Sequence, residues 1–331
     1  MRLACIAGIM VALAVTSGAT QGVRDTLLVV VNRAPALATI YRVEVNGLTR
    51  LDAVAVGKGP REVCVSPDGR RAYVGNQGAS SVTAIDLATR KVIATIDDPA
   101  LAGADGCVVS ADSSRVYVAP SGAAAVAVIG ADTLAVVQKI PVPLKVLRRV
   151  TFSPDGQRLY VTSNQTPDIA EVDVKTGALT RTIRVGREPR GGLGFLKDGT
   201  IVAGSVEDDT LYFLDPATGA VKRIIGVPAS PQRIAVSPSG VLYVLCRIGQ
   251  KLSGEVSRPT LLAIFNPEKH DESVAADVAQ APWGLAMTAS GDRLFVSSNS
   301  GDTVQIVDGK TMKVLATVPT DKDPNGLAVR Q

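Results

Sequence analysis

Arginine recurs at equivalent positions of a phrase that the sequence repeats, and converging arginines are suited to binding an anion. The phrase is clearest at residues 60–69, which read Pro-Arg-Glu-Val-Cys-Val-Ser-Pro-Asp-Gly. The two residues after the leading proline position vary between copies, and these two anchor rows hold five arginines against two acids. Their candidate ligand-binding members are Arg61, Glu62, Asp105, Arg148, Arg149, Arg190, Arg233, Trp283 and Asn325. A carboxylate, a phosphate or a nucleic-acid strand would suit such a set.

The same residues also allow a purely structural role. The arginines could pair with Glu62 and Asp105 and simply hydrate a polar channel. Trp283, the only tryptophan, could stack on a planar ligand or on an arginine. Glycines in the second anchor row would let a ligand approach the backbone closely.

Other chemistry is sparsely represented. His270 is the only histidine, so a multi-histidine metal site is excluded and a Ser-His-Asp triad would have to use a charged outer turn. The carboxylates at 207–209 match no calcium loop, and we expect an exposed turn there. A single tryptophan argues against a quinone cofactor, and no phosphate loop or haem motif stands out. We therefore predict neither a metal nor a cofactor.

Short β-strands in a repeat must position the anchor rows. The first row falls at residues 61, 105, 148, 190, 232, 283 and 325, so successive copies are 42 to 51 residues apart. Within a copy, residues 71–75, 81–87 and 92–96 read as strands separated by turn residues. A period of about 40–45 residues with four strands per repeat is typical of a β-propeller. We predict an all-β, seven-bladed propeller of four-stranded antiparallel blades, in which the anchor rows lie at one mouth of the central channel.

The two ends of the chain are predicted to complete one blade together. Residues 26–32, 39–45 and 50–56 form three strands, and residues 324–329 supply the missing inner strand. Joining them closes the ring, because an open ring would expose a sheet edge. The longest step between anchors places an insertion at 247–259, which is either a functional loop or a tolerated hairpin extension.

The N-terminus reads as a secretory signal peptide. Arg2 precedes an apolar run at 3–15, and small residues prepare a cleavage site between 19 and 22. Retention as a short anchor is the alternative. We expect one propeller domain at 23–331, periplasmic or secreted, monomeric, and without a membrane span after cleavage. Loss of Arg2 reduces the net charge of +4 to +3, which is too mild to indicate nucleic acid.

Three cysteines remain after that cleavage, at 64, 107 and 246. An odd count at wide spacing predicts neither a disulfide framework nor a zinc site. The first expectation is three buried thiols. A Cys64–Cys107 disulfide is the alternative, because these two fall on neighbouring repeats.

Several phrases carry a family resemblance. Residues 73–76 (Tyr-Val-Gly-Asn) and 160–164 (Tyr-Val-Thr-Ser-Asn) resemble the signature of YVTN-family propellers, and residues 295–299 are a looser copy. Residues 85–89, 172–177 and 214–219 resemble that family's strand-and-turn phrase. The resemblance spans the mature chain and implies the fold. It does not fix the function, since such propellers include surface-layer, DNA-binding, lactonase-like and cofactor-associated proteins.

Three functions remain open. The preferred one is non-catalytic binding, at the channel mouth, of an anionic small molecule or a protein partner; single-stranded nucleic acid is weakly supported, because aromatics for base stacking are few. The second is a lactonase-like hydrolase or lyase, in which Arg148, Arg149 and Arg190 would hold a carboxylate or stabilise an oxyanion and an anchor-row acid would be the base. The third is a structural or assembly scaffold, or an accessory to a periplasmic redox pathway.

Overall fold

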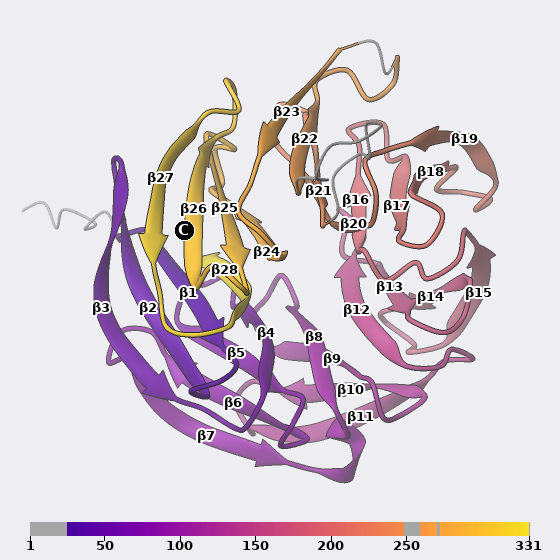
Figure 1. Cartoon of the computed structure of the whole chain (residues 1–331). Coiled ribbons are helices and arrows are strands. Elements are labelled where there is room, and N and C mark those ends of the chain that lie inside the picture. The colour runs from indigo at the N-terminus through magenta and orange to yellow at the C-terminus, as the bar shows by residue number, and fades with distance from the viewer. Residues whose placement is uncertain (1–24, 248–258, 270–271, 331) are drawn as a thin grey trace, which may run out of the picture.

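The structure, a computed structural model, describes residues 25–247, 259–269 and 272–330. Seven four-stranded antiparallel sheets stand around one central axis, as the sequence predicts (Figure 1). The innermost strands are β4 (Pro60–Val65), β8 (Ala104–Val109), β12 (Leu147–Phe152), β16 (Leu193–Phe195), β20 (Pro231–Val236), β24 (Pro282–Met287) and β28 (Pro324–Arg330). The second strands are β1 (Leu27–Asn32), β5 (Arg71–Asn76), β9 (Arg115–Pro120), β13 (Arg158–Ser163), β17 (Ile201–Ser205), β21 (Leu242–Cys246) and β25 (Arg293–Ser298).

Two further strands complete each blade. The third strands are β2 (Leu37–Glu44), β6 (Ser81–Asp86), β10 (Ala125–Gly130), β14 (Asp168–Asp173), β18 (Thr210–Leu214), β22 (Thr260–Ile264) and β26 (Thr303–Asp308). The outer strands are β3 (Gly47–Ala55), β7 (Lys91–Asp97), β11 (Ala135–Pro141), β15 (Leu179–Arg184), β19 (Val221–Gly226), β23 (Ser273–Asp277) and β27 (Val314–Pro319). A short 3-10 helix, η1 (Pro99–Leu101), lies between β7 and β8. Within the described residues, no helix is long and apolar enough to cross a membrane.

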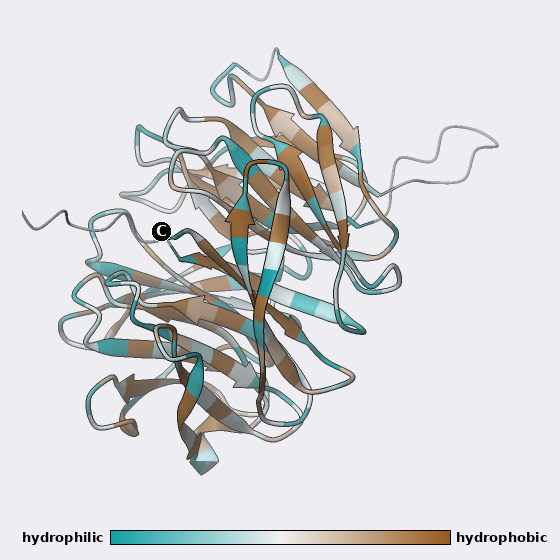
Figure 2. Cartoon of the chain, turned by 90° about the vertical axis from the view of Figure 1, so that its left-hand side faces the viewer, coloured by the Kyte–Doolittle hydropathy of each residue, from teal (hydrophilic) through white to brown (hydrophobic). Residues whose placement is uncertain are grey.

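The core lies between neighbouring blades. Second strands are buried over nearly their whole length, whereas outer strands alternate exposed and partly buried residues. Figure 2 shows the same trend, with hydrophobic colour along the strands and hydrophilic colour at the loops. Tyr73, Tyr117, Tyr243 and Phe295 are fully buried. The aromatic residue that opens the YVTN-like phrase is therefore a packing residue, and burying one such side chain contributes about 1.5–3 kcal/mol.

The first and last segments share a blade, which confirms the predicted closure. Its strand order is β28-β1-β2-β3. The Asn32 side-chain amide donates to the Thr320 hydroxyl at 2.8 Å and to the Asp321 carbonyl at 2.7 Å, which ties β1 to the loop before β28. The predicted strand limits are correct to within a few residues.

The Asp-Gly turns have the structural role expected of them. Gly69 has a φ of +68°, a backbone conformation that favours glycine. The Asp68 carboxylate accepts hydrogen bonds from the Ser66 hydroxyl at 2.6 Å and the Arg70 amide at 3.0 Å. These aspartates shape turns, on the face of the ring opposite the anchor rows.

One blade departs from the repeat. The inner strand expected from Arg190 begins only at Leu193. Gly192 has a φ of +91°, and a side chain at Gly191 would collide with the Pro231 carbonyl oxygen. The glycine pair therefore replaces the start of the strand with a close backbone approach to the next blade.

Two neighbouring blades are covalently linked. Cys64 in β4 and Cys107 in β8 form a disulfide, with their Cα atoms 5.8 Å apart. The expectation of three free thiols is therefore wrong, and the alternative left open by the repeat register is the one found. Cys246 is free and buried, and burial raises the pKa of its thiol to about 12. The predicted signal peptide at 1–19 lies outside the described residues.

Candidate functional site

A β-bulge at the start of the inner strands turns the anchor rows toward the channel. In β4, Pro60 pairs with Asn76 and Glu62 with Gly75, so Arg61 has no partner in the ladder. The same shift appears at the start of β8, β12, β20, β24 and β28. Such bulges re-aim a side chain and leave one residue unpaired. The repeat thus builds a ring of inward-directed positions, which the sequence fills mainly with arginine.

The first cluster of the site is centred on Asp105, which is almost fully buried. Its carboxylate is hydrogen-bonded to Arg148, lies 3.8 Å from the Arg61 Nε and accepts from the Gln77 amide at 3.4 Å. Burial raises the pKa of Asp105, and the opposing effect of the two arginines does not cancel it. Burial also lowers the pKa of Arg61 to about 10.

The second cluster is centred on Glu62. One carboxylate oxygen accepts from Arg149 at 3.1 Å and also from Arg233. Burial opposes the ionisation of Glu62, but the two arginines outweigh it and lower its pKa to about 2. Burial lowers the pKa of Arg233 to about 9. Glu62 therefore stays ionised and is a weak base.

The indole of Trp283 is covered by arginines. The guanidinium carbons of Arg61, Arg247 and Arg233 lie 4.4, 5.3 and 5.7 Å from its ring centroid. Of the two roles that the sequence left open, the structure thus shows stacking on arginine. The indole Nε1 is buried and has no hydrogen-bond partner among the described residues.

The remaining candidates lie around these clusters. Arg190 has its Nε 3.3 Å from a Glu188 carboxylate oxygen and donates to Asn164 at 3.4 Å. Burial lowers the pKa of Arg190. Asn325 instead belongs to its own turn, since its amide donates to Asp323. The anchor-row arginines therefore meet at the mouth, whereas Asn325 is not among the residues that line the outer cavity.

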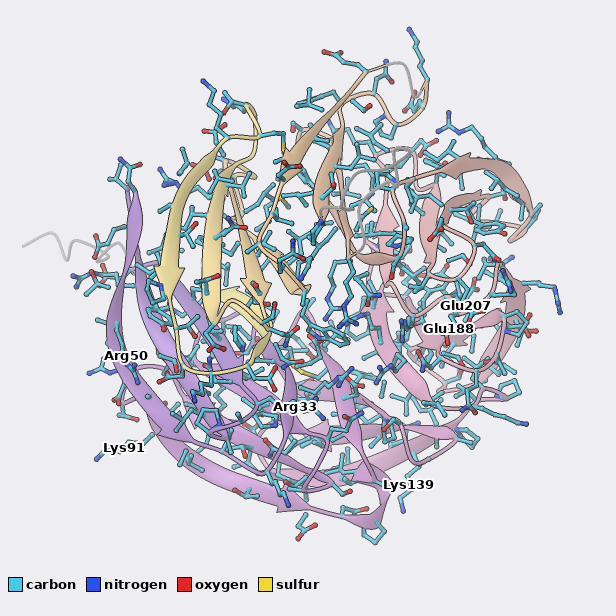
Figure 3. All side chains as sticks on the ribbon, in the orientation of Figure 1. Arg33, Arg50, Lys91, Lys139, Glu188 and Glu207 are labelled. Carbon is cyan, nitrogen blue, oxygen red and sulfur yellow. A yellow bond between two sulfur atoms is a disulfide. The ribbon has the colours of Figure 1, made fainter. Side chains whose placement is uncertain are left out.

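A second row of residues also reaches the site, and these residues were not predicted from the sequence. Gln77, Asn164 and Arg247 each follow the last residue of a second strand or lie just beyond it, and each contacts an anchor residue. Arg33 follows β1 in the same way and weakens the protonation of Arg61 electrostatically; Figure 3 labels it near the inner end of its blade. The signal was available, because the residue after each of these second strands lies at the same mouth as the anchor rows.

Two cavities lie on either side of the Glu62 cluster. The outer one measures about 10 Å³, which is about the space of one water molecule, and is lined by Arg61, Asp105, Arg148, Arg149, Arg190, Gln232, Arg233 and Trp283. The inner one measures about 170 Å³ and is lined by Glu62, Cys107, Arg149, Arg233 and the glycines at 106, 191 and 192, among others. Arg149 and Arg233 belong to both and separate them.

Two larger hollows lie elsewhere. A depression of about 530 Å³ at the other end of the channel is lined mainly by apolar residues such as Phe195, Val236 and Met287. A crevice of about 290 Å³ lies between two blades near Phe213 and Arg223. Neither gathers charges of one sign. Among the described residues, no three His, Cys, Asp or Glu side chains are arranged to hold a metal ion, and His270 lies outside that part of the chain.

The comparisons with known proteins agree with this architecture. The family model described as "Lactonase, 7-bladed beta-propeller" matches residues 24–191. The chain belongs to this lactonase family of propellers. The narrower YVTN assignment stays a prediction. No curated protein matches the sequence significantly.

This lactonase-family propeller is similar in fold to solved structures of several differently named proteins. Hydrazine synthase of Kuenenia stuttgartiensis is 21% identical with a TM-score of 0.71, over 82% of this chain and 89% of that one. A putative 6-phosphogluconolactonase of Bacteroides fragilis is 18% identical with a TM-score of 0.70, over 93% and 98%. Dihydro-heme d1 dehydrogenase NirN is 17% identical with a TM-score of 0.65, over 91% and 74%. At these identities the likeness concerns the fold alone.

Proposed function

We propose that this lactonase-family propeller is an exported binding protein that captures a small anion at the arginine-lined mouth of its channel. The observation that carries the proposal is a charge imbalance inside a buried site. Five anchor-row arginines converge there, and the carboxylates that pair with them are Glu62, Asp105 and Glu188. An excess of buried positive charge is costly unless an anion compensates it.

The surroundings favour a small anion over a nucleic-acid strand. Loops at the same end of the blades carry Asp98, Asp208, Asp302 and Asp321 around the mouth. Three of these carboxylates pair with Lys139, Arg187 and Arg50, so the loops are close to neutral and do not attract a polyanion. The small arginine-lined cavity also leaves no room for a strand. Figure 3 shows nitrogen-ended side chains converging near the centre of the ring, away from the labelled Lys91 and Lys139 at its edge.

Binding without turnover is supported by the state of the acids. Glu62, with a pKa of about 2, is poorly suited to accept a proton near neutrality. Export is supported by the Cys64–Cys107 disulfide, since such bonds persist mainly in oxidising compartments.

Lactone hydrolysis is the second candidate. It is favoured by family membership and by Asp105, whose raised pKa and position beside Arg148 are features of a general acid or base. In that case Arg148 would stabilise the oxyanion. The two proposals differ in whether a lactone is turned over.

A thermal-shift experiment on residues 23–331 tests capture. Sulfate, succinate, a sugar phosphate, a lactone and a short single-stranded DNA are added at constant low ionic strength. A native-state ligand must raise the midpoint. We expect a rise with a small anion, lost in Arg148→Ala/Arg149→Ala and kept in the charge-matched control Lys91→Ala/Lys139→Ala. No rise with any anion, or equal loss in the control, would refute capture; product formation from the lactone would favour the enzyme.

A further inference from the structure

The arginines at the mouth outnumber the carboxylates that pair with them. Asp105 is shared by Arg61 and Arg148, and Glu62 is shared by Arg149 and Arg233. Each of these two clusters therefore has one more positive than negative charge, while Arg190 is balanced by Glu188. Among the described residues, the five anchor-row arginines thus exceed their three carboxylates by two charges, and Arg33 and Arg247 add to this excess.

Two buried N–H donors at the mouth have no acceptor within the described residues. They are the Nε of Arg149 and the Nε1 of Trp283. Buried donors are nearly always satisfied, so each is available to an acceptor from outside the described residues. Both residues line the outer cavity. A ligand there needs acceptor oxygens that reach both donors.

The space limits that ligand to one compact group. The outer cavity has room for about one water molecule, and Arg149 and Arg233 close its inner side against the larger cavity below. An extended acid cannot enter as a whole. A single anionic head, free or at the end of a larger molecule, is also larger than one water molecule, so it can bind only if the arginine side chains around the cavity move apart.

From these three observations we infer that the mouth selects a compact divalent oxyanion, of the sulfate or phosphate class, over monovalent anions. The inference rests on the proposed anion capture and specifies its ligand. A dianion compensates more of the excess charge than a monovalent anion does, and its oxygens can accept from the Nε of Arg149 and the Nε1 of Trp283. Guanidinium groups suit such oxygens, because they offer paired donors in a fixed plane.

Isothermal titration calorimetry at constant ionic strength tests the selectivity. Sulfate and methyl sulfate share a tetrahedral sulfur, and the methyl ester removes one charge together with one free acceptor oxygen; acetate extends the monovalent series. We expect sulfate to bind at least tenfold more tightly than either. Equal affinities for sulfate and methyl sulfate would overturn the inference and leave anion capture intact. Absence of binding by every anion would refute both.

A phosphate monoester adds a pH test, because its second pKa is about 6. Its affinity should rise at least fivefold from pH 5 to pH 7.5, while that of sulfate stays within twofold. The sulfate titration serves as the control for the titratable acids of the mouth. These are Glu62, Asp105 and Glu188 within the site and Asp98, Asp208, Asp302 and Asp321 on the loops around it. Equal pH profiles for the two ligands would contradict selection by charge. A monoester that binds at least as tightly as free phosphate would identify a terminal group as an accepted ligand, and weaker binding of the monoester would identify the free ion.

One variant removes a single excess charge. Arg148→Gln should weaken sulfate more than methyl sulfate and so reduce their ratio, whereas Lys91→Gln at the outer edge should leave the ratio unchanged. An unchanged ratio in a folded Arg148→Gln protein would contradict the role of the excess charge.

Discussion

Glu62 accepts a hydrogen bond from Arg233 across 171 positions of sequence, in a part of the channel where both side chains are buried. The two residues stand at bulges of inner strands on different sides of the ring. Their bond shows that the anchor rows act as one site. A carboxylate that holds two arginines also keeps their heads at a fixed separation, which leaves the outer cavity open between the clusters.

Replacing Glu62 by Gln should destabilise the fold strongly. The change leaves Arg149 and Arg233 without their shared counter-ion, and breaking a buried ion pair in this way costs about 3–5 kcal/mol. Chemical denaturation measures the loss. Glu188→Gln is the control, because its pair with Arg190 is partly exposed and should be worth at most about 1 kcal/mol. Equal losses of unfolding free energy in the two variants would show that the Glu62 cluster stabilises the fold no more than the Glu188–Arg190 pair does.

Glu62 should also make the protein sensitive to acid. Its pKa is lowered from 4.5 to about 2 in the folded state, so the unfolded chain binds its proton first as the pH falls. The stability that Glu62 contributes is full above pH 4.5 and is lost between pH 4.5 and about 2. Unfolding curves of the wild type and Glu62→Gln should therefore converge over that range. A constant difference in stability between the two proteins over this pH range would show that Glu62 does not cause the acid sensitivity.

Anion affinity should fall in alkaline solution. Burial lowers the pKa of Arg233 to about 9 and that of Arg61 to about 10, so these side chains lose their charge far below the usual range for arginine. Sulfate titrations at pH 7.5, 9 and 10 should give successively weaker binding, with circular dichroism as a check on folding. Constant affinity up to pH 10 would show that both arginines keep their protons or take no part.

The Cys64–Cys107 disulfide should stabilise the ring. It closes a loop across 43 positions, for which chain entropy predicts about 4 kcal/mol. Reduction, or Cys64→Ala/Cys107→Ala, should lower the melting temperature, while Cys246→Ala serves as a cysteine substitution outside the bridge. Thiol titration of unfolded, unreduced protein without residues 1–19 should find one thiol. Three thiols in that sample would contradict the bridge.

Ring closure should depend on the C-terminal strand. Deleting residues 323–331 removes β28, which pairs with β1 and completes the shared blade. We expect a large drop in melting temperature, because the deletion exposes a sheet edge and opens the ring. Val45→Ser, at an exposed turn of the same blade, is the control. An unchanged melting temperature after loss of β28 would refute closure.

Much of this arrangement could be predicted from the sequence. The spacing of the anchor rows predicted seven blades. The first repeat has only three strands, and this missing inner strand predicted the blade shared by the two ends of the chain. Arginine convergence also followed, since equivalent positions of a radial repeat meet at one mouth.

The remaining features depend on side-chain contacts and backbone conformations that the repeat pattern does not specify. Which acid holds which arginine, such as Glu62 with Arg233, is decided by side-chain reach across the channel. The short β16 results from Gly191 and Gly192, whose backbone conformation a strand pattern does not reveal. The second row, with Gln77 and Arg247, was hidden because those residues look like ordinary turn residues.

The most direct test of anion capture uses Trp283, the only tryptophan, as a reporter inside the site. Its fluorescence is quenched with iodide and with caesium at equal ionic strength. Anion capture predicts an iodide-to-caesium quenching ratio above that of N-acetyltryptophanamide, protection by added sulfate, and loss of the excess ratio in Arg148→Ala/Arg149→Ala. A ratio equal to that of N-acetyltryptophanamide, unaffected by sulfate, would show that the mouth does not attract anions.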